Sequence, residues 1–184
     1  MRNVRFHPEP VQSLNKDRGR FNVLLTEDRL RGPDHWSHQL PRLMEPMGVQ
    51  SYRACCGEEA LEVASRVPIH AAVVDVSIPR VAPPATPQAE PATSQQGLPG
   101  GLWLLELFRR MPQHPPVIIV HSRTITSRDV QRLLHEALRL GAFTVLENNV
   151  GLEQMLGVFR RMLDRLYQGL WPEPPTGKRH DDVK

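Results

Sequence analysis

Short apolar runs alternate along this chain with longer stretches in which apolar residues recur at helical spacing, and this alternation constrains the fold more than any other feature. The two clearest runs, residues 23–26 and 71–75, contain β-branched residues and carry no charge before they end. Such runs are typical of strands buried on both faces of a parallel sheet. Similar or weaker runs predict further strands over residues 49–54, 116–121 and 142–146.

The stretches between these runs predict five helices, each with one apolar stripe. Pro41 should kink or shorten the first of them. The stripes comprise Trp36, Leu40, Leu43 and Met44; residues 57–64; Leu102, Leu104, Leu105 and Phe108; Val130, Leu133, Leu134, Ala137 and Leu138; and Leu152, Met155, Leu156, Phe159, Leu163 and Leu166. Strict alternation of strand and helix predicts an α/β protein: a doubly wound, five-stranded parallel sheet in a three-layer α/β/α arrangement.

One core with tails suits a chain of 184 residues. We expect a single domain over residues 21–168. Residues 1–20 carry five basic and two acidic groups and form a predicted disordered basic tail, and residues 169–184 form a C-terminal tail. A proline-rich segment at about 81–99 interrupts the domain. It is predicted as a surface insertion, with a lid or docking segment beside Asp75 as the alternative.

The charge pattern bears on possible partners. The basic tail accounts for the whole net charge of +3, so the predicted domain is neutral. A neutral domain argues against binding of nucleic acid. No apolar stretch approaches membrane-spanning length, and the N-terminus lacks the apolar segment of a signal peptide. The sequence therefore predicts a cytoplasmic protein without a membrane partner.

Cysteines and histidines give no sign of a metal framework. Cys55 and Cys56 are adjacent and are the only cysteines. They are predicted as reduced, partly buried thiols, with a vicinal disulfide as the alternative. The histidines are scattered without zinc-like spacing, so no zinc site is predicted.

Carboxylates follow the two clearest apolar runs. Glu27 and Asp28 come directly after the first run, and Asp75 ends the other. Because parallel strands end at a common edge of an open α/β sheet, we expect these three side chains to converge. Such a cluster suits a hard divalent cation and leaves one carboxylate available for reaction.

Six segments of the chain, taken in order, resemble the receiver domain of two-component response regulators. They are Val23–Asp28, Gly57–Leu61, Val73–Pro79, Gly101–Leu105, Pro116–Val120 and Gly141–Ala142. The resemblance covers about residues 21–168. It implies a flavodoxin-like, CheY-like fold and a role in phosphorelay signalling.

The resemblance also implies a set of site residues. Asp75 occupies the position that accepts a phosphoryl group from a histidine kinase or phosphotransfer protein. Asp28 would bind Mg²⁺ directly, Glu27 mostly through water, and the backbone carbonyl of Ser77 would complete the protein ligands. A phosphoacceptor of this kind is not an enzyme in its own right.

The chain departs from the family pattern at the switch positions. His121 stands where receivers have threonine or serine, and Ser122 could substitute only if the strand has already ended. Asn148, preceded by Glu147, stands where receivers have a lysine that stabilises the phosphoryl oxygens. His121 could act as a donor or cation near the phosphoryl group, or pack as a neutral side chain. The receiver predicted here is degenerate.

Three hypotheses follow from these features. The first is a single receiver domain that is phosphorylated on Asp75 with Mg²⁺. The second is a pseudo-receiver, a protein-binding scaffold of the same fold that does not depend on phosphorylation. The third is an enzyme or cofactor protein on a flavodoxin-like sheet, which we do not favour because the acidic residues after the first strand would repel an anion.

Output is expected to pass to another protein, because only sixteen residues follow the last predicted helix. In receivers the contact face is formed by the fourth helix, fifth strand and fifth helix. Here the two helices carry several arginines, which are either solvated or dock an acidic partner. They are Arg128, Arg132, Arg139, Arg160, Arg161 and Arg165. Trp171 either packs on the domain or anchors a partner.

Overall fold

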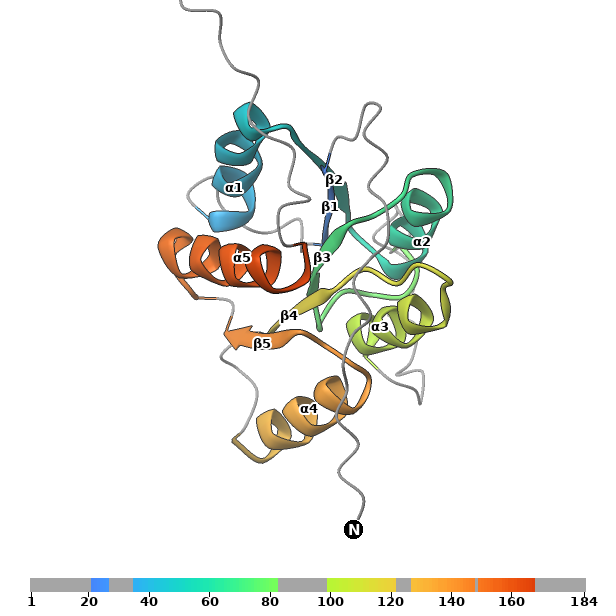
Figure 1. Cartoon of the computed structure of the whole chain (residues 1–184). Coiled ribbons are helices and arrows are strands. Elements are labelled where there is room, and N and C mark those ends of the chain that lie inside the picture. The colour runs from blue at the N-terminus through green and yellow to red at the C-terminus, as the bar shows by residue number, and fades with distance from the viewer. Residues whose placement is uncertain (1–20, 27–34, 83–98, 122–126, 148, 168–184) are drawn as a thin grey trace, which may run out of the picture.

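A computed structural model describes residues 21–26, 35–82, 99–121, 127–147 and 149–167. Five parallel strands form one sheet in the order β2-β1-β3-β4-β5. They are β1 (Phe21–Thr26), β2 (Val49–Ala54), β3 (Ala71–Asp75), β4 (Val117–His121) and β5 (Thr144–Glu147). The predicted fold class is confirmed: the sheet is doubly wound and lies between two layers of helices (Figure 1).

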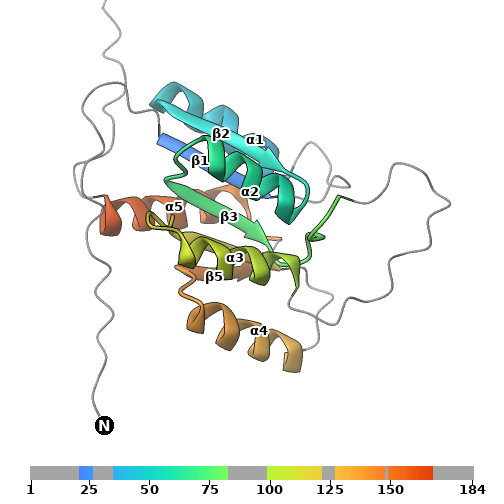
Figure 2. The ribbon, with the colours of Figure 1, turned by 90° about the vertical axis from the view of Figure 1, so that its right-hand side faces the viewer.

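The helices divide between the two faces of the sheet. One face is covered by α1 (Trp36–Met44) and α5 (Leu152–Leu166), which contact each other. The other is covered by α2 (Gly57–Arg66), α3 (Gly100–Arg110) and α4 (Ser127–Arg139), with α3 touching both neighbours. Figure 2 shows this second layer in front of the sheet. A short 3-10 helix, η1 (Glu45–Met47), follows α1 and ends at Gly48, whose φ of +83° suits glycine.

Alternation along the strands explains the unbroken apolar runs. In β3, Ala72 and Val74 join the core under α3, whereas Ala71 and Val73 join the core under α5. Successive side chains of a strand point to opposite faces, so a strand covered on both faces is apolar at every position. Phe108 and Phe159 are among the largest fully buried side chains of the two cores.

Two predicted core positions are wrong. Leu43 in α1 is 49% exposed, and Leu138 in α4 is 59% exposed. In α4 the neighbouring Ala137 is fully buried, and each helical residue is turned by about 100° from the last. Leu138 therefore lies beyond the edge of the apolar stripe, as an i+1 neighbour of a buried residue does.

The start of β5 also differs from the prediction. This strand begins at Thr144 rather than at residue 142, because the Ala142 amide closes the turn after α4 and Phe143, whose amide bonds to β4, leads into the strand. The Ala142 amide donates to the carbonyl of Ala137, and the Phe143 amide donates to that of Val117. Pro41, as predicted, lies in a short first helix of nine residues.

The described residues do not include residues 1–20 and 168–184, which contain the two predicted tails, or most of the segment 81–99. The predicted tails and insertion therefore remain expectations. Within the described part of the chain, no helix combines the length and the apolar character needed to cross a membrane.

Candidate functional site

The candidate site lies where β1, β3 and β4 end at one edge of the sheet. Asp75 is the last residue of β3 and is only 2% exposed. It pairs with Val120 of β4, so His121, 5% exposed at the end of β4, is one position further along the neighbouring strand. The parallel register thus brings Asp75 and His121 to the same edge.

Two hydrogen bonds fix Asp75. Its backbone amide donates to Oγ1 of Thr26 at 2.8 Å, across to the end of β1. Its carboxylate oxygen Oδ1 accepts from the backbone amide of Ser77 at 2.8 Å. A buried carboxylate requires such partners, because desolvation without them is costly. The side chain therefore has a defined orientation, and Ser77 belongs to the same site.

The segment after Asp75 is held between the N-termini of α2 and α3. The amides of Gly57 and Glu58 donate to the carbonyls of Pro79 and Arg80, both at 2.9 Å. The Arg80 guanidinium lies 4.6 Å from the centre of the Trp103 ring, a cation–π contact. Backbone bonds and this contact together fix the path of the chain that carries Ser77.

Close backbone approach also positions α3. A Cβ at Gly101 would lie 2.5 Å from the carbonyl oxygen of Asp75, and one at Gly100 would lie 2.1 Å from that of Ile78. Only glycine allows the start of α3 to pack this closely on the end of β3.

Of the predicted site residues, the structure describes Asp75, Ser77 and His121, and it gathers all three at this edge. Glu27, Asp28, Ser122 and Asn148 lie outside the described residues. Glu147, the residue before Asn148, is exposed at the end of β5.

Sequence reasoning missed the residues that position Asp75. Thr26 was predicted only as part of a strand, and no role was predicted for Trp103. The signal available was that Thr26 is a polar residue ending a buried apolar run, where an unpaired hydroxyl would be unfavourable.

The donors present fit a hard cation. Asp75 offers a carboxylate at this edge, and one of its oxygens accepts a hydrogen bond from the Ser77 amide. Mg²⁺ prefers such oxygen ligands and retains several waters. The described part of the site therefore agrees chemically with a magnesium site.

The chain is similar in structure to receiver domains. A CheY-like response regulator receiver domain protein from Methanospirillum hungatei JF-1 matches with a TM-score of 0.55 at 16% identity, covering 82% of this chain and 99% of that one. Chemotaxis response regulator CheY4 of Vibrio cholerae matches with a TM-score of 0.56 at 21% identity, covering 79% and 100%. NtrX from Brucella abortus matches with 0.57 at 15% identity, covering 81% of this chain but 28% of that one.

Sequence comparison is less informative than structure. No protein-family model matches the chain, and no curated protein matches it either. The shared property is the fold: five parallel strands and five helices arranged as in response regulator receiver domains.

Proposed function

We propose that this chain, which has the receiver fold, acts in two-component phosphorelay signalling by accepting a phosphoryl group on Asp75. The observation that carries the proposal is a buried carboxylate at the end of β3 that accepts a hydrogen bond from the Ser77 amide, while the backbone amide of the same residue is held by the Thr26 hydroxyl. A fixed oxygen nucleophile at a sheet edge meets the positional demand of in-line phosphoryl transfer.

The chemistry needs one bond exchange. A carboxylate oxygen of Asp75 attacks the phosphorus of a phosphohistidine on a histidine kinase or phosphotransfer protein. The new O–P bond forms as the N–P bond breaks, and the imidazole leaves with its electron pair. The product is an acyl phosphate on Asp75.

The resemblance supplies the metal ligands of this proposal. Mg²⁺ would be held by Glu27, Asp28, Asp75 and the Ser77 carbonyl. When bound, it would neutralise the charge that develops on the phosphoryl oxygens. Such a site depends on acidic side chains from the ends of β1 and β3, and Thr26 already joins those two strand ends.

The proposed switch contacts are His121, Ser122 and Asn148. Asparagine can donate a hydrogen bond but has no charge, so the phosphoryl group lacks the fixed cation found in receivers. Loss of one electrostatic donor costs about 3–4 kcal/mol of stabilisation at most. We therefore expect slower formation of the adduct than in an ordinary receiver.

The test is the intact mass of the protein after incubation with Mg²⁺ and a small phosphoramidate or acyl phosphate donor. Wild type should gain one phosphoryl group, and Asp75→Asn should gain none. Removal of Mg²⁺ with a chelator should abolish the gain. A wild type that stays unmodified at saturating donor contradicts the proposal.

One observation favours the pseudo-receiver as a second candidate. The end of β4 presents a buried imidazole, His121, in place of the hydroxyl of receivers. If the chain is such a scaffold, the wild type and Asp75→Asn should bind the partner equally well. The same variant therefore distinguishes a phosphoacceptor from a pseudo-receiver.

Output would use the face formed by α4, β5 and α5. A surface groove of about 510 Å³ lies between the start of β5 and α5, and its lining combines apolar and charged side chains. The lining residues are Phe143, Thr144, Val158, Arg161, Asp164 and Arg165. An acidic protein partner in the cytoplasm would suit the exposed arginines of this face.

A further inference from the structure

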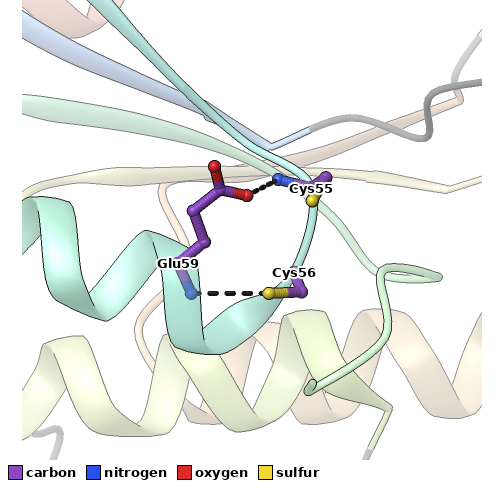
Figure 3. A group of neighbouring side chains, drawn as sticks. All are labelled: Cys55, Cys56 and Glu59. Carbon is purple, nitrogen blue, oxygen red and sulfur yellow. Dashed lines mark hydrogen bonds between the residues drawn. The ribbon is translucent and has the colours of Figure 1, made fainter. Parts of the chain in front are cut away.

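A second group of ligand-bearing side chains lies at the end of β2 and the start of α2. Cys55, Cys56 and Glu59 each offer one atom there: two thiol sulfurs and a carboxylate oxygen, all within 4.8 Å of one another. Figure 3 shows the three side chains gathered around the first turn of α2. Cys56 is buried and Cys55 is half-buried, and both carry reduced thiols.

Two hydrogen bonds hold this group together. The Cys55 amide donates to Oε2 of Glu59 at 2.7 Å, and the Glu59 amide donates to Sγ of Cys56 at 3.4 Å (Figure 3). Cys56 is the N-cap of α2, and the pattern resembles a capping box with a thiol in place of the usual hydroxyl, except that Glu59 returns to the amide of Cys55, one residue before the cap. The reciprocal bonds fix the spacing of the donors before any ligand arrives.

The donor set selects a particular class of metal. Two sulfurs with one carboxylate suit a thiophilic divalent cation such as Zn²⁺, whereas Mg²⁺ takes oxygen ligands alone. Zn–S bonds of about 2.3 Å in a tetrahedral site place two sulfurs roughly 3.8 Å apart. The observed spacing requires a movement of about 1 Å or less, within reach of side-chain rotation.

Metal binding is compatible with the cap. A thiolate sulfur can accept an N–H bond while it binds a metal, and carboxylate ligands of metals are commonly held by such outer hydrogen bonds. Glu59 can present Oε1 to a metal while Oε2 accepts from Cys55. The N-terminal end of α2 also favours negative charge on these ligands.

We propose that Cys55, Cys56 and Glu59 form a binding site for Zn²⁺ or a related thiophilic divalent cation, with water as the fourth ligand. Binding displaces the thiol protons to solvent and forms two metal–sulfur bonds and one metal–oxygen bond. This site contains no histidine, so the scattered histidines of the sequence gave no indication of it. It is independent of the function proposed for Asp75.

The test is titration of the full chain with Co²⁺ and then Zn²⁺, in the presence of a phosphine reductant. Wild type should bind one Co²⁺ with a thiolate-to-cobalt charge-transfer band, and Zn²⁺ should displace it with submicromolar affinity. Cys55→Ser and Cys56→Ser should each lower the affinity by about 100-fold or more, since even outer-shell changes cost about 10–100-fold. Serine is a good N-cap, so α2 is retained in Cys56→Ser.

Glu58 provides the matched control for Glu59, because it lies in the same helical turn, is exposed and is outside the donor group. Glu59→Gln should lower affinity by about 10-fold or more while keeping an oxygen that accepts from Cys55. Glu58→Gln and Asp75→Asn should bind as wild type does. No charge-transfer band in wild type, a band that persists in the serine variants, or equal losses in the two glutamine variants would each overturn the proposal.

Discussion

His70 occupies a small polar network at the edge of the sheet opposite Asp75. Its Nδ1 accepts a hydrogen bond from the backbone amide of Asn22 at 2.8 Å. Its ring stacks on the Phe21 ring, with the two ring centroids 5.1 Å apart. The hydroxyl of Tyr167 donates to the His70 carbonyl. Burial lowers the pKa of His70 below its ordinary value of 6.5 and raises the pKa of Tyr167 to about 12.

This environment predicts a pH-dependent stability. The unfolded chain takes up a proton on His70 near pH 6.5, whereas the folded chain takes it up only at lower pH. Below about pH 6.5 the unfolded state therefore binds more protons than the folded state. The free energy of unfolding falls with pH until the pKa of His70 in the folded protein is passed. The free energy of unfolding by urea should be lower at about pH 5.5 than at about pH 7.5.

His70→Gln isolates the contribution of this imidazole, because other groups titrate in the same range. The variant should lose less stability than wild type over the same pH interval. Equal losses in the two proteins would assign the pH dependence to other groups.

Residue roles of this kind could not be predicted from the sequence. The network of Asn22, His70 and Tyr167 joins residues 48 and 97 positions apart, and no local pattern indicates such pairs. By contrast, the burial of Asp75 could be predicted, because the residue ends an apolar run. Such a run is visible in consecutive residues of the sequence and indicates a buried strand. The bond from the Glu59 amide to the Cys56 thiol was detectable from the three-residue spacing, with cysteine interpreted as a capping residue.

Among the elements, the start of α3 is the most tightly constrained. Gly101→Ala would place a Cβ 2.5 Å from the Asp75 carbonyl oxygen and 2.6 Å from Cα of Val76. Backbone atoms cannot yield as a side chain can, so α3 must shift away from β3. We expect a loss of about 1–3 kcal/mol in the free energy of unfolding, measured by urea denaturation.

Gly157 in α5 is the matched control, because a Cβ there would meet its nearest atom, in the Arg161 side chain, at 3.8 Å. Gly157→Ala should stabilise the protein by about 0.4–1 kcal/mol, since alanine restricts the unfolded chain and suits a helix. Equal effects of the two substitutions would contradict the close packing of α3 on β3.

Element identities were predictable because both periodicities are strong. The paired runs of β3 and β4 and the stripe of α5 match their predicted ranges within two residues. Boundaries were less predictable where an apolar residue serves a turn, as Ala142 does. The edges of the apolar stripes on the helices were also predicted wrongly, as the exposure of Leu138 shows. Propensity carries no information on how far around a helix the core extends.

At the scale of the whole molecule, one sheet separates two cores. Phe108 lies in the core under α3 and Phe159 in the core under α5, and both are fully buried. Phe108→Ala and Phe159→Ala should each lower the free energy of unfolding by about 3–5 kcal/mol. Because the two cores share every central strand, each variant should unfold in one transition by both circular dichroism and tryptophan fluorescence.

Leu138→Ala is the control, because this side chain is 59% exposed. Its effect should stay within about 0.5 kcal/mol. Transitions that separate between the two spectroscopic probes would show that the cores unfold independently.

The strand order bears on how the chain folds as it is made. β2 pairs with β1, β3 pairs with β1, β4 pairs with β3, and β5 pairs with β4. Each strand after the first thus finds its partner among strands already synthesised, and after β3 the sheet grows at one side only. Apart from β1, which waits for β2, no strand of this sheet waits unpaired for a later one during translation, and this limits the exposed edges through which nascent chains aggregate.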